Sequence, residues 1–544
     1  MGEPYFTPGV PLLLEKRGSG EAEPGDLALV RPGRGRAKLE RVLGRADAIE
    51  TVLQGLLVEE GQERGFHPYE PRDASSSYED RVDLRGELSY TIDPETAKDF
   101  DDALTLYPDR ALVHIADVFW FVRSGSPLDR GAIERALSVY VPGLVAPMLP
   151  PELSEDACSL RPYTDRLCVT VELPLDAELR PGEARFYRSV IRSRERLTYP
   201  QAEAILSGAQ RADPELTASL RLAERLTTAL RERRFARGAL RIESGEVAFR
   251  FDGKGGVTDA RRESEPHAHM LVEELMIMAN EAVAALLAGR RRDALFRVHE
   301  RPEPQSIELL LARLAELEVP TPPAPERMTP AEGAAVAAAA SKAVSDYTGH
   351  AGRGRDAFPA LVLQALKQAR YDPRNLGHSG LASTAYCHFT SPIRRYPDLV
   401  CHRALLRELG ASDDPVPDDL PEVAEHASVR EREAAQIEYR ADELCLAWLL
   451  ERRLFERGWE EPFTGEIVGL IPSGLFLRFD DVFEGFLPAR RLAGDYFELN
   501  ALRTALVGRR GRRYRLGDAL EVRVQEIRRT EGKVELAPAG LARD

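Results

Sequence analysis

The sequence predicts a multidomain α+β protein built from three units. At 544 residues the chain is too long for one ordinary hydrophobic core. The middle of the chain is first strand-like and then increasingly helical, and short strands return near the C-terminus. A polar linker, DASSSYED, separates the first unit from the second. We therefore expect a small β-rich and helical N-terminal unit, a large central α+β domain and a C-terminal five-stranded barrel, with bounds at 1–80, 81–458 and 459–544.

The N-terminal unit combines short strands with one helix. Strands are expected at 10–17, 26–31 and 38–43, with glycine and proline between them. The segment 46–60 then carries apolar residues at helical spacing. The roughly 45 residues of the strand region are few for a complete five-stranded barrel. A trimmed cold-shock-like barrel and a winged helix both fit this pattern, so the fold of this nucleic-acid-binding unit stays open.

The central domain contains a run of carboxylates between apolar strands. In TIDPETAKDFDDAL, four aspartates fall within ten residues, namely Asp93, Asp99, Asp101 and Asp102. The end of a strand precedes them, and 103–107 and 111–118 follow as strands around a Pro-Asp turn. Carboxylates crowded into a partly dry loop raise one another's pKa values. A divalent cation such as magnesium or manganese relieves that repulsion. The ordinary alternative is a solvated acidic loop.

The other central segments give a mixed pattern. We expect a buried strand at 112–122 and an ordered loop at 138–151 that carries Tyr140. Paired strands are expected at 161–174 and 184–194, and a hairpin is expected at 247–258. Helices are expected at 200–234, 267–287, 331–345, 358–369 and 422–455. His267 and His269 lie two residues apart, which does not place them on one helix face, so a zinc site is not expected.

Two arginines follow a helix breaker late in the central domain. A Ser-Pro pair at Ser391 interrupts the chain, and a helical pattern resumes at 393–405. Ser391 or Thr390 is expected to cap this helix, whose first turn bears Arg394 and Arg395. Backbone amides, the helix dipole and the guanidinium groups would together form an anion site. The ordinary alternative is that these arginines pair with nearby acidic side chains.

The C-terminal unit shows short strands with aromatic and basic residues. The five expected strands are 463–467, 474–479, 483–487, 519–527 and 533–536. Phe463, Phe476 and Phe486 lie in these strands, and arginines cluster at 509–515. This pattern suits a small barrel that stacks bases on aromatic rings and binds phosphates with arginine. Some of the rings are expected to serve only as barrel core.

The composition limits the partners and the location. The net charge of −15 argues against a general nucleic-acid binder, although arginines cluster locally. No run of 18 or more uncharged apolar residues occurs, so no membrane span is expected. The first residues lack the pattern of an export signal. Five scattered cysteines form no CxxC pair, which indicates neither a zinc site nor a disulfide framework and favours the cytoplasm.

Several of these motifs, in this order, resemble the RNB ribonucleases, the family of the ribonuclease II and ribonuclease R exoribonucleases. The resemblance covers about 85–540. It is carried by TIDPETAKDFDDAL, HIADVFWFV, SVYVPGLVAPMLPPELSEDACSL, HMLVEELMIMAN and HFTSPIRRYPDL. The C-terminal unit resembles the RNA-binding barrel of ribosomal protein S-one type in GEIVGLIPSGLFLRF and EGFLPARRL. The resemblance therefore implies an RNB catalytic domain followed by an RNA-binding barrel of the oligonucleotide-binding type.

This resemblance implies a processive 3′→5′ exoribonuclease acting in RNA turnover. Such an enzyme hydrolyses single-stranded RNA with a free 3′ end to nucleoside 5′-monophosphates and uses magnesium. Arg394 matches the family's arginine at the scissile phosphate. The residues that match its magnesium-binding and catalytic aspartates are Asp93, Asp99, Asp101 and Asp102.

The expected RNA contacts come from several parts of the chain. Tyr140 matches the family's stacking aromatic, while the matches of Tyr199 and Phe249 to further aromatic clamps are looser. Either Glu273 or Glu274 should read the terminal nucleotide, and the sequence leaves open which. The residues expected to contact RNA are Tyr140, Tyr199, Phe249, Glu273, Glu274, Arg395 and Phe476.

The chain departs from the family pattern at both ends. Members typically carry two cold-shock barrels before the catalytic body, and about 80 residues cannot hold two. A long lysine-rich tail is also missing, which favours ribonuclease II over ribonuclease R. We expect a monomer.

Three rival classes are also compatible with parts of the pattern: an endonuclease or DNase with the same metal chemistry, a catalytically inactive or regulatory RNA-binding protein on the same scaffold, and a calcium-binding module. The last is disfavoured because 93–102 lacks the glycine and closing glutamate of an EF-hand.

Overall fold

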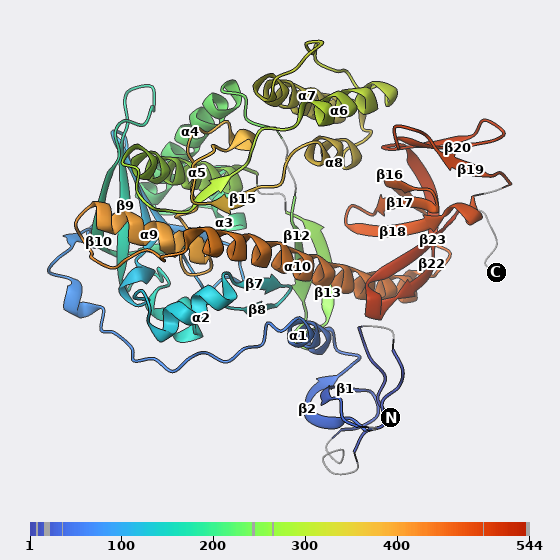
Figure 1. Ribbon diagram of the computed structural model, residues 1–544, viewed down its shortest axis with the longest axis horizontal. Coiled ribbons are helices and arrows are strands. Elements are labelled where there is room, and N and C mark those ends of the chain that lie inside the picture. The colour runs from blue at the N-terminus through green and yellow to red at the C-terminus, as the bar shows by residue number, and fades with distance from the viewer. Residues whose placement is uncertain are drawn as a thin grey trace.

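One long helix, α10 (Leu420–Arg457), connects the parts of the molecule. The computed structural model describes residues 1–6, 9–15, 22–34, 36–241, 245–263, 266–492 and 494–539. A body of sheet and helices lies towards one end of α10 and a closed barrel towards the other, while the N-terminal unit lies below its middle (Figure 1). Within the described residues, no helix is long and apolar enough to cross a membrane.

The body is organised around a seven-stranded sheet with the order β11-β4-β5-β6-β9-β10-β3. The inner strands pair antiparallel, whereas the edge strands β11 and β3 pair parallel with β4 and β10. Nearly every residue of β4, β5 and β6 is buried, so both faces of the sheet are covered there. The strands are β3 (Val82–Asp83), β4 (Tyr90–Asp93), β5 (Asp102–Tyr107), β6 (Arg110–Ala116), β9 (Asp165–Pro174), β10 (Arg185–Arg192) and β11 (Glu195–Thr198).

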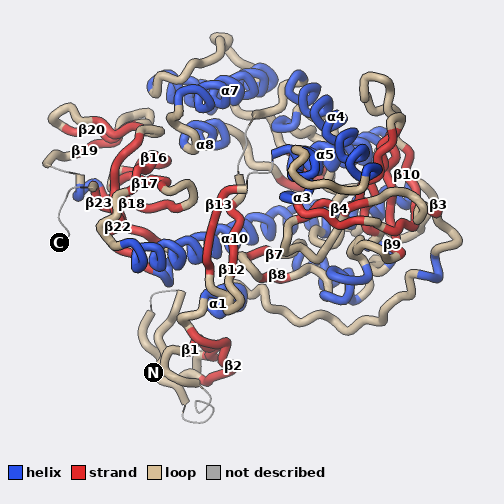
Figure 2. The backbone as a smooth tube through the Cα atoms, turned by 180° about the vertical axis from the view of Figure 1, so that it is seen from behind, coloured by secondary structure: helices blue, strands red, loops and turns tan. Residues whose placement is uncertain are grey.

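Three helices pack against this sheet, and one of them, α3, contacts the edge strand β11. They are α3 (Tyr199–Leu206), α4 (Pro214–Ala236) and α5 (Pro266–Gly289) (Figure 2). Thr198 begins α3 with a capping box to Gln201, and Asp213 caps α4 by accepting two backbone N–H bonds. The methionines of α5 contribute to the core, as Met278 shows with 5% exposure.

The remaining elements of the body join the sheet to α10. Two hairpins, β7/β8 and β12/β13, lie against α10 or against the helix α1 (Ile49–Glu59) beside it. The bounds are α2 (Pro127–Arg135), β7 (Val139–Val141), β8 (Leu144–Ala146), β12 (Val247–Phe251), β13 (Val257–Arg262), β14 (Phe296–Val298), α6 (Pro304–Glu316), α7 (Pro330–Ala351), α8 (Ala357–Gln364), β15 (Arg370–Asp372) and α9 (Tyr396–Glu408).

The N-terminal unit contains β1 (Asp26–Arg31), β2 (Lys38–Arg45) and α1 (Ile49–Glu59). The two strands form an antiparallel pair, and α1 packs on both of them and on α10. The expected strand at 10–17 is not continuous: its described part, 10–15, makes only isolated bridges, and residues 16–17 lie outside the described residues. An extended segment then crosses the body, where Arg72 donates to the Trp120 carbonyl at 2.7 Å.

The C-terminal unit is a closed barrel with the strands that the sequence predicts. Its strands are β16 (Phe463–Ile471), β17 (Gly474–Phe479), β18 (Phe483–Pro488), β22 (Ala519–Arg528) and β23 (Lys533–Pro538). A small sheet of β19 (Phe497–Leu499), β20 (Ala505–Gly508) and β21 (Arg513–Arg515) is inserted between β18 and β22. The arginine cluster at 509–515 therefore belongs to this insertion and not to the barrel wall.

Three local predictions need correction. The strand expected at 112–122 ends at Ala116, because Asp117 leaves the sheet to pair with the buried Arg81. The loop at 138–151 contains the β7/β8 hairpin. The helix expected from 393 begins at Tyr396, since the residue before it is extended with φ −137° and ψ 124°.

Candidate active site

The four aspartates gather at one edge of the central sheet. β4 ends at Asp93 and β5 begins at Asp102, and because the two strands are antiparallel neighbours, both residues lie at the same end of the pair. Asp99 and Asp101 lie in the loop between them. Asp93 and Asp101 are buried, with exposures of 9% and 4%. The apolar flanks thus fold into strands that hold the carboxylates close together.

Burial and mutual repulsion raise the pKa values of three of these carboxyls. The pKa of Asp93 rises to about 6, mainly through burial and further through Asp99. The pKa of Asp102 rises to about 7 for the same first reason, with Asp93 adding to it. The pKa of Asp101 lies well above its usual value because its burial outweighs the opposing charge of Arg394. A positive charge between these carboxyls would stabilise their ionised form and lower their pKa values.

The donor chemistry of the cluster fits a divalent cation. The Oδ2 atoms of Asp93 and Asp101 are buried and accept no hydrogen bond from any residue that the structure describes. Buried carboxylate oxygens of this kind are the ligands that magnesium prefers. Over the described part of the chain, however, no three His, Cys, Asp or Glu side chains already stand in a metal-holding arrangement. The cluster therefore supplies charge and donors without a finished coordination cage.

The segment before α9 brings an arginine to this cluster. Arg394 Nε lies 3.4 Å from Asp101 Oδ2, and the Arg394 side chain keeps 45% of its surface exposed. Asp101 Oδ1 accepts from the Ile393 N–H at 2.8 Å, and Arg394 Nη2 lies 3.1 Å from Ser391 Oγ. On the other side, the Ser138 N–H donates to the Arg394 carbonyl at 3.0 Å. The backbone is thus held on two sides, while the half-exposed guanidinium lies beside Asp101.

Arg395 has a different role from its neighbour. Its Nε and Nη2 atoms each donate to Asp398 at 2.9 Å, and Asp398 is completely buried. Asp398 also accepts from the Ser391 N–H at 2.8 Å. Since Arg395 is paired with this carboxylate, the structure places the side chain expected to contact RNA in an internal ion pair. Of these two arginines, it is Arg394 that lies against an aspartate of the cluster.

Two tyrosines border the carboxylates. The Tyr140 hydroxyl donates to Asp99, and its backbone N–H donates to Glu438 at 2.8 Å. Tyr199 stacks on His269 with ring centroids 3.8 Å apart, and its pKa is raised by burial and by the charges of Asp102 and Asp93. The structure therefore brings both rings to the site.

Other expected RNA contacts lie elsewhere. Phe249 is on β12, opposite Ala260 of β13, and packs against the apolar cluster that surrounds α10. Phe476 is on the barrel strand β17, where its ring lies 5.1 Å from that of Phe486. The structure thus divides the predicted residues between the carboxylate site, the β12/β13 hairpin and the barrel.

The two glutamates on α5 differ in their surroundings. Glu274 is 2% exposed and accepts from Arg234 Nε at 3.1 Å, so it is the counter-ion of that arginine. Glu273 lies 3.2 Å from the same guanidinium but keeps half of its side-chain surface exposed. Arg234 lies on α4 and makes the difference, because it pairs closely with the buried Glu274 and leaves Glu273 half-exposed. No pattern in the sequence pointed to this arginine.

Sequence reasoning also missed an anchor for the arginine segment. Asn280 on α5 is buried, and its Oδ1 accepts from the Phe389 N–H at 2.9 Å. Its Nδ2 donates to the Tyr386 hydroxyl at 3.1 Å. The signal that could identify it is a lone amide within an apolar helical run.

Comparisons with known proteins agree with this organisation. Residues 81–410 match the model of the RNB domain, and residues 460–537 match that of the S1 RNA binding domain. Ribonuclease R of Escherichia coli (strain K12) is 35% identical over 503 residues, which cover 88% of this chain and 59% of that relative. Ribonuclease R of Thermotoga maritima is 34% identical over 532 residues, which cover 93% of this chain and 73% of that relative.

Solved structures give the same result. The apo form of Mycoplasma genitalium RNase R has a TM-score of 0.85 and 25% identity, covering 97% of this chain and 85% of that one. The same protein in complex with ribose methylated single-stranded RNA has a TM-score of 0.82 and 27% identity, covering 92% and 80%. The relatives carry the name ribonuclease R, whereas the sequence analysis favoured ribonuclease II within the same family. The chain belongs to the RNB ribonuclease family, with a C-terminal S1 domain.

Proposed function

We propose that this chain is a processive 3′→5′ exoribonuclease that hydrolyses single-stranded RNA to nucleoside 5′-monophosphates in RNA turnover. One observation carries the proposal: four crowded aspartates meet the exposed guanidinium of Arg394, with Tyr140 and Tyr199 beside them. Family membership supports it, although the chain spans about 59% of the length of the Escherichia coli relative.

The side chains of the site divide the chemistry among themselves. Asp93, Asp99, Asp101 and Asp102 would hold a divalent cation, magnesium or manganese, which when bound activates water and stabilises the departing 3′ oxygen. Arg394 neutralises charge on the scissile phosphate, and the backbone bonds around it fix its position. Tyr140 and Tyr199 stack on the last bases, which contributes about 1–3 kcal/mol per base without selecting a sequence.

The metal assignment has a test that does not depend on activity. Magnesium should raise the Tm of the wild-type protein, because a bound cation stabilises the folded state and relieves the repulsion between the carboxylates. The variant Asp102→Asn removes one negative charge and one ligand, so its magnesium-induced shift should fall to less than half. The exposed carboxylate change Glu425→Gln is the matched control and should keep the full shift. Equal shifts in all three proteins would contradict the assignment.

The reaction is tested with 5′-labelled RNA and magnesium. With this label, an exonuclease working from the 3′ end leaves one short labelled end product, and a 3′-phosphate block should protect the strand. Labelled fragments of intermediate length from the 3′-blocked strand would instead identify an endonuclease. Binding without any product would identify the alternative, a catalytically inactive or regulatory RNA-binding protein on the same scaffold.

The setting of this activity is part of the proposal. The five cysteines are free and buried, which suits a reducing cytoplasm. We propose a monomer that acts on RNA with a free 3′ end, and light scattering of the purified protein measures its mass directly.

A further inference from the structure

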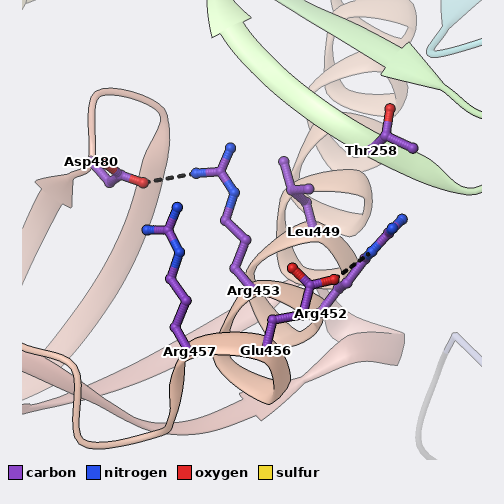
Figure 3. Close-up of a pocket in the computed structure, with 7 residues that line it drawn as sticks. All are labelled: Thr258, Leu449, Arg452, Arg453, Glu456, Arg457 and Asp480. Carbon is purple, nitrogen blue, oxygen red and sulfur yellow. Dashed lines mark hydrogen bonds and ion pairs between the residues drawn. The ribbon is translucent and has the colours of Figure 1, made fainter.

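A cavity of about 350 Å³ lies at the C-terminal end of α10, away from the carboxylate site. Three elements enclose it: α10, strand β13 of the hairpin, and the turn between β17 and β18 of the barrel (Figure 3). Three of its lining residues are arginines and two are acidic, so its local charge is positive although the chain has a net charge of −15. The residues that line it are Thr258, Leu449, Arg452, Arg453, Glu456, Arg457 and Asp480.

The three arginines are held with different strength. Arg453 is the fixed one, because its guanidinium lies 2.8 Å from Asp480 and 3.1 Å from Asp259, and its side chain is only 23% exposed. It therefore joins α10 to the barrel turn and to the hairpin. Arg453 forms the wall of the cavity, and its charge is already matched.

Arg452 and Arg457 are held more weakly, and apart from its carboxylate partner Arg452 donates a long bond of 3.5 Å to the Val257 carbonyl. Their side chains are 50% and 59% exposed, and the carboxylates that pair with them, Glu456 and Glu461, lie four residues further along the chain at 3.2 and 3.5 Å. Solvent-exposed pairs of this kind are weak. A phosphate diester can replace such a carboxylate, since guanidinium groups bind phosphate oxygens through charge-assisted hydrogen bonds.

An exposed aromatic ring lies on α10 beside the cavity, on the side of Arg452, and does not itself line the cavity. Phe455 is 72% exposed, which is a high exposure for a phenylalanine. It lies three residues after Arg452, so the two side chains are neighbours on the helix surface. Phe455 also meets Trp459 edge to face, with ring centroids 5.9 Å apart. Exposed rings beside arginines are typical of surfaces that bind single-stranded nucleic acid.

We propose that Arg452, Arg457 and Phe455 form an outer RNA-binding site, where the two arginines bind backbone phosphates and the ring stacks on a base. This inference rests on the proposed function, because it assigns the site to the RNA strand upstream of the clamped 3′ end. Glu438, which binds the backbone of Tyr140, lies fifteen residues before Arg453 on α10. That separation is ~22 Å at ~1.5 Å per residue. A stacked strand advancing ~3.4 Å per nucleotide spans it with roughly six or seven nucleotides.

RNA binding measured without hydrolysis tests the outer site. In EDTA, the variant Arg452→Gln/Arg457→Gln should bind a 20-nucleotide RNA ~10-fold more weakly than the wild type, and the slope of log affinity against log salt should fall by ~1.4. Affinity for a 5-nucleotide RNA should change by less than ~2-fold, because that strand ends before it reaches the cavity. Phe455→Ala should weaken binding of the long RNA and leave the salt slope unchanged, since a ring carries no charge.

The controls separate this site from general effects. Arg432→Gln removes one exposed charge from the other end of α10 and should retain both affinities. Arg453 stays unchanged so that the barrel remains attached, and Arg452→Lys/Arg457→Lys keeps the charge but loses bidentate geometry, so it should recover part of the affinity.

Two results would overturn the outer site. One is a 20-nucleotide affinity that stays unchanged in the double variant, or that falls equally for both RNA lengths. The other concerns small anions: inorganic phosphate or a mononucleotide binds in the low millimolar range, and this binding depends on Arg452 and Arg457 whereas binding of the long RNA does not. That result would make the cavity a small-anion site. Because EDTA prevents hydrolysis, these results stand apart from the proposed exonuclease activity, which the time course on magnesium decides separately.

Discussion

Asp101 belongs to two parts of the site at once. One of its oxygens accepts from the Ile393 N–H, and the other lies 3.4 Å from Arg394 Nε and has no hydrogen bond. A single buried carboxylate therefore fixes the backbone of the arginine segment and keeps a free oxygen towards the cluster. Through these two contacts, Asp101 holds Arg394 next to the aspartate cluster although the two residues lie almost 300 positions apart in the sequence.

A second acidic residue gives a pH test at the residue scale. Burial, then Glu438, Glu246 and Glu443, raise the pKa of Asp442 from 3.8 to about 7. Between those pH values the folded protein holds a proton that the unfolded chain has lost, so the contribution of Asp442 to stability falls as pH rises. Asp442→Asn should therefore have a higher Tm than the wild type at pH 8, with a smaller difference at pH 5.

Thermal unfolding at both pH values measures this difference. Glu425→Gln, an exposed carboxylate change on the same helix, should show no such dependence. If Asp442→Asn had the same Tm as the wild type at pH 8, the raised pKa of this carboxyl would be wrong.

At the scale of elements, α5 positions the arginine segment. The helix is apolar along most of its buried face, and Asn280 interrupts it to accept the Phe389 N–H. That bond joins α5 to the chain that leads into Arg394. The position of the guanidinium thus depends on a helix that makes no bond to it.

Asn280→Ala should lower kcat by ~10–100-fold, because loss of the anchor lets the arginine segment shift relative to the aspartates. It should also cost about 1–3 kcal/mol of stability, since the buried Phe389 N–H loses its partner. Steady-state kinetics and urea unfolding measure the two effects. Tyr386→Phe removes only the other partner of Asn280 and should retain most of kcat. An unchanged kcat in Asn280→Ala would show that the anchor is dispensable.

Local sequence patterns predicted most helices and strands. The features that they did not predict depend on contacts between residues that are distant in the sequence or that form only in the fold. Strands on both sides of the aspartates and all five barrel strands follow from apolar runs bounded by turn residues. The start of α9 does not, because Arg395 is held extended while it pairs with Asp398. The different surroundings of Glu273 and Glu274 depend on Arg234, about 40 residues earlier and on another helix. No local periodicity contains such information.

At the scale of the whole molecule, one apolar cluster joins the units. It runs from α1 through the β12/β13 hairpin, α8 and α10 into the barrel. Phe358 of α8 is fully buried in it and lies against Gly517 of the barrel, where an added Cβ would come within 2.7 Å of the ring. The S1 barrel is therefore packed on the body and not simply tethered to it.

Phe358→Ala should destabilise the protein by about 3–5 kcal/mol, because it leaves a cavity between α8 and the barrel. Leu363→Ala changes a half-exposed residue of the same helix and should stay within about 0.5 kcal/mol of the wild type. Denaturant unfolding followed by tryptophan fluorescence measures both. Similar losses in the two variants would mean that the barrel does not depend on this contact.

The central claim is that the aspartate cluster performs hydrolysis and does not merely bind RNA. Single-turnover digestion of 3′-labelled RNA by Asp101→Asn and Asp102→Asn, with magnesium and enzyme in excess, tests it most directly. We predict that release of the terminal monophosphate slows by at least ~10²–10³-fold, while the affinity for the same RNA measured in EDTA is retained. Release of monophosphate at the wild-type rate by either variant would contradict the claim.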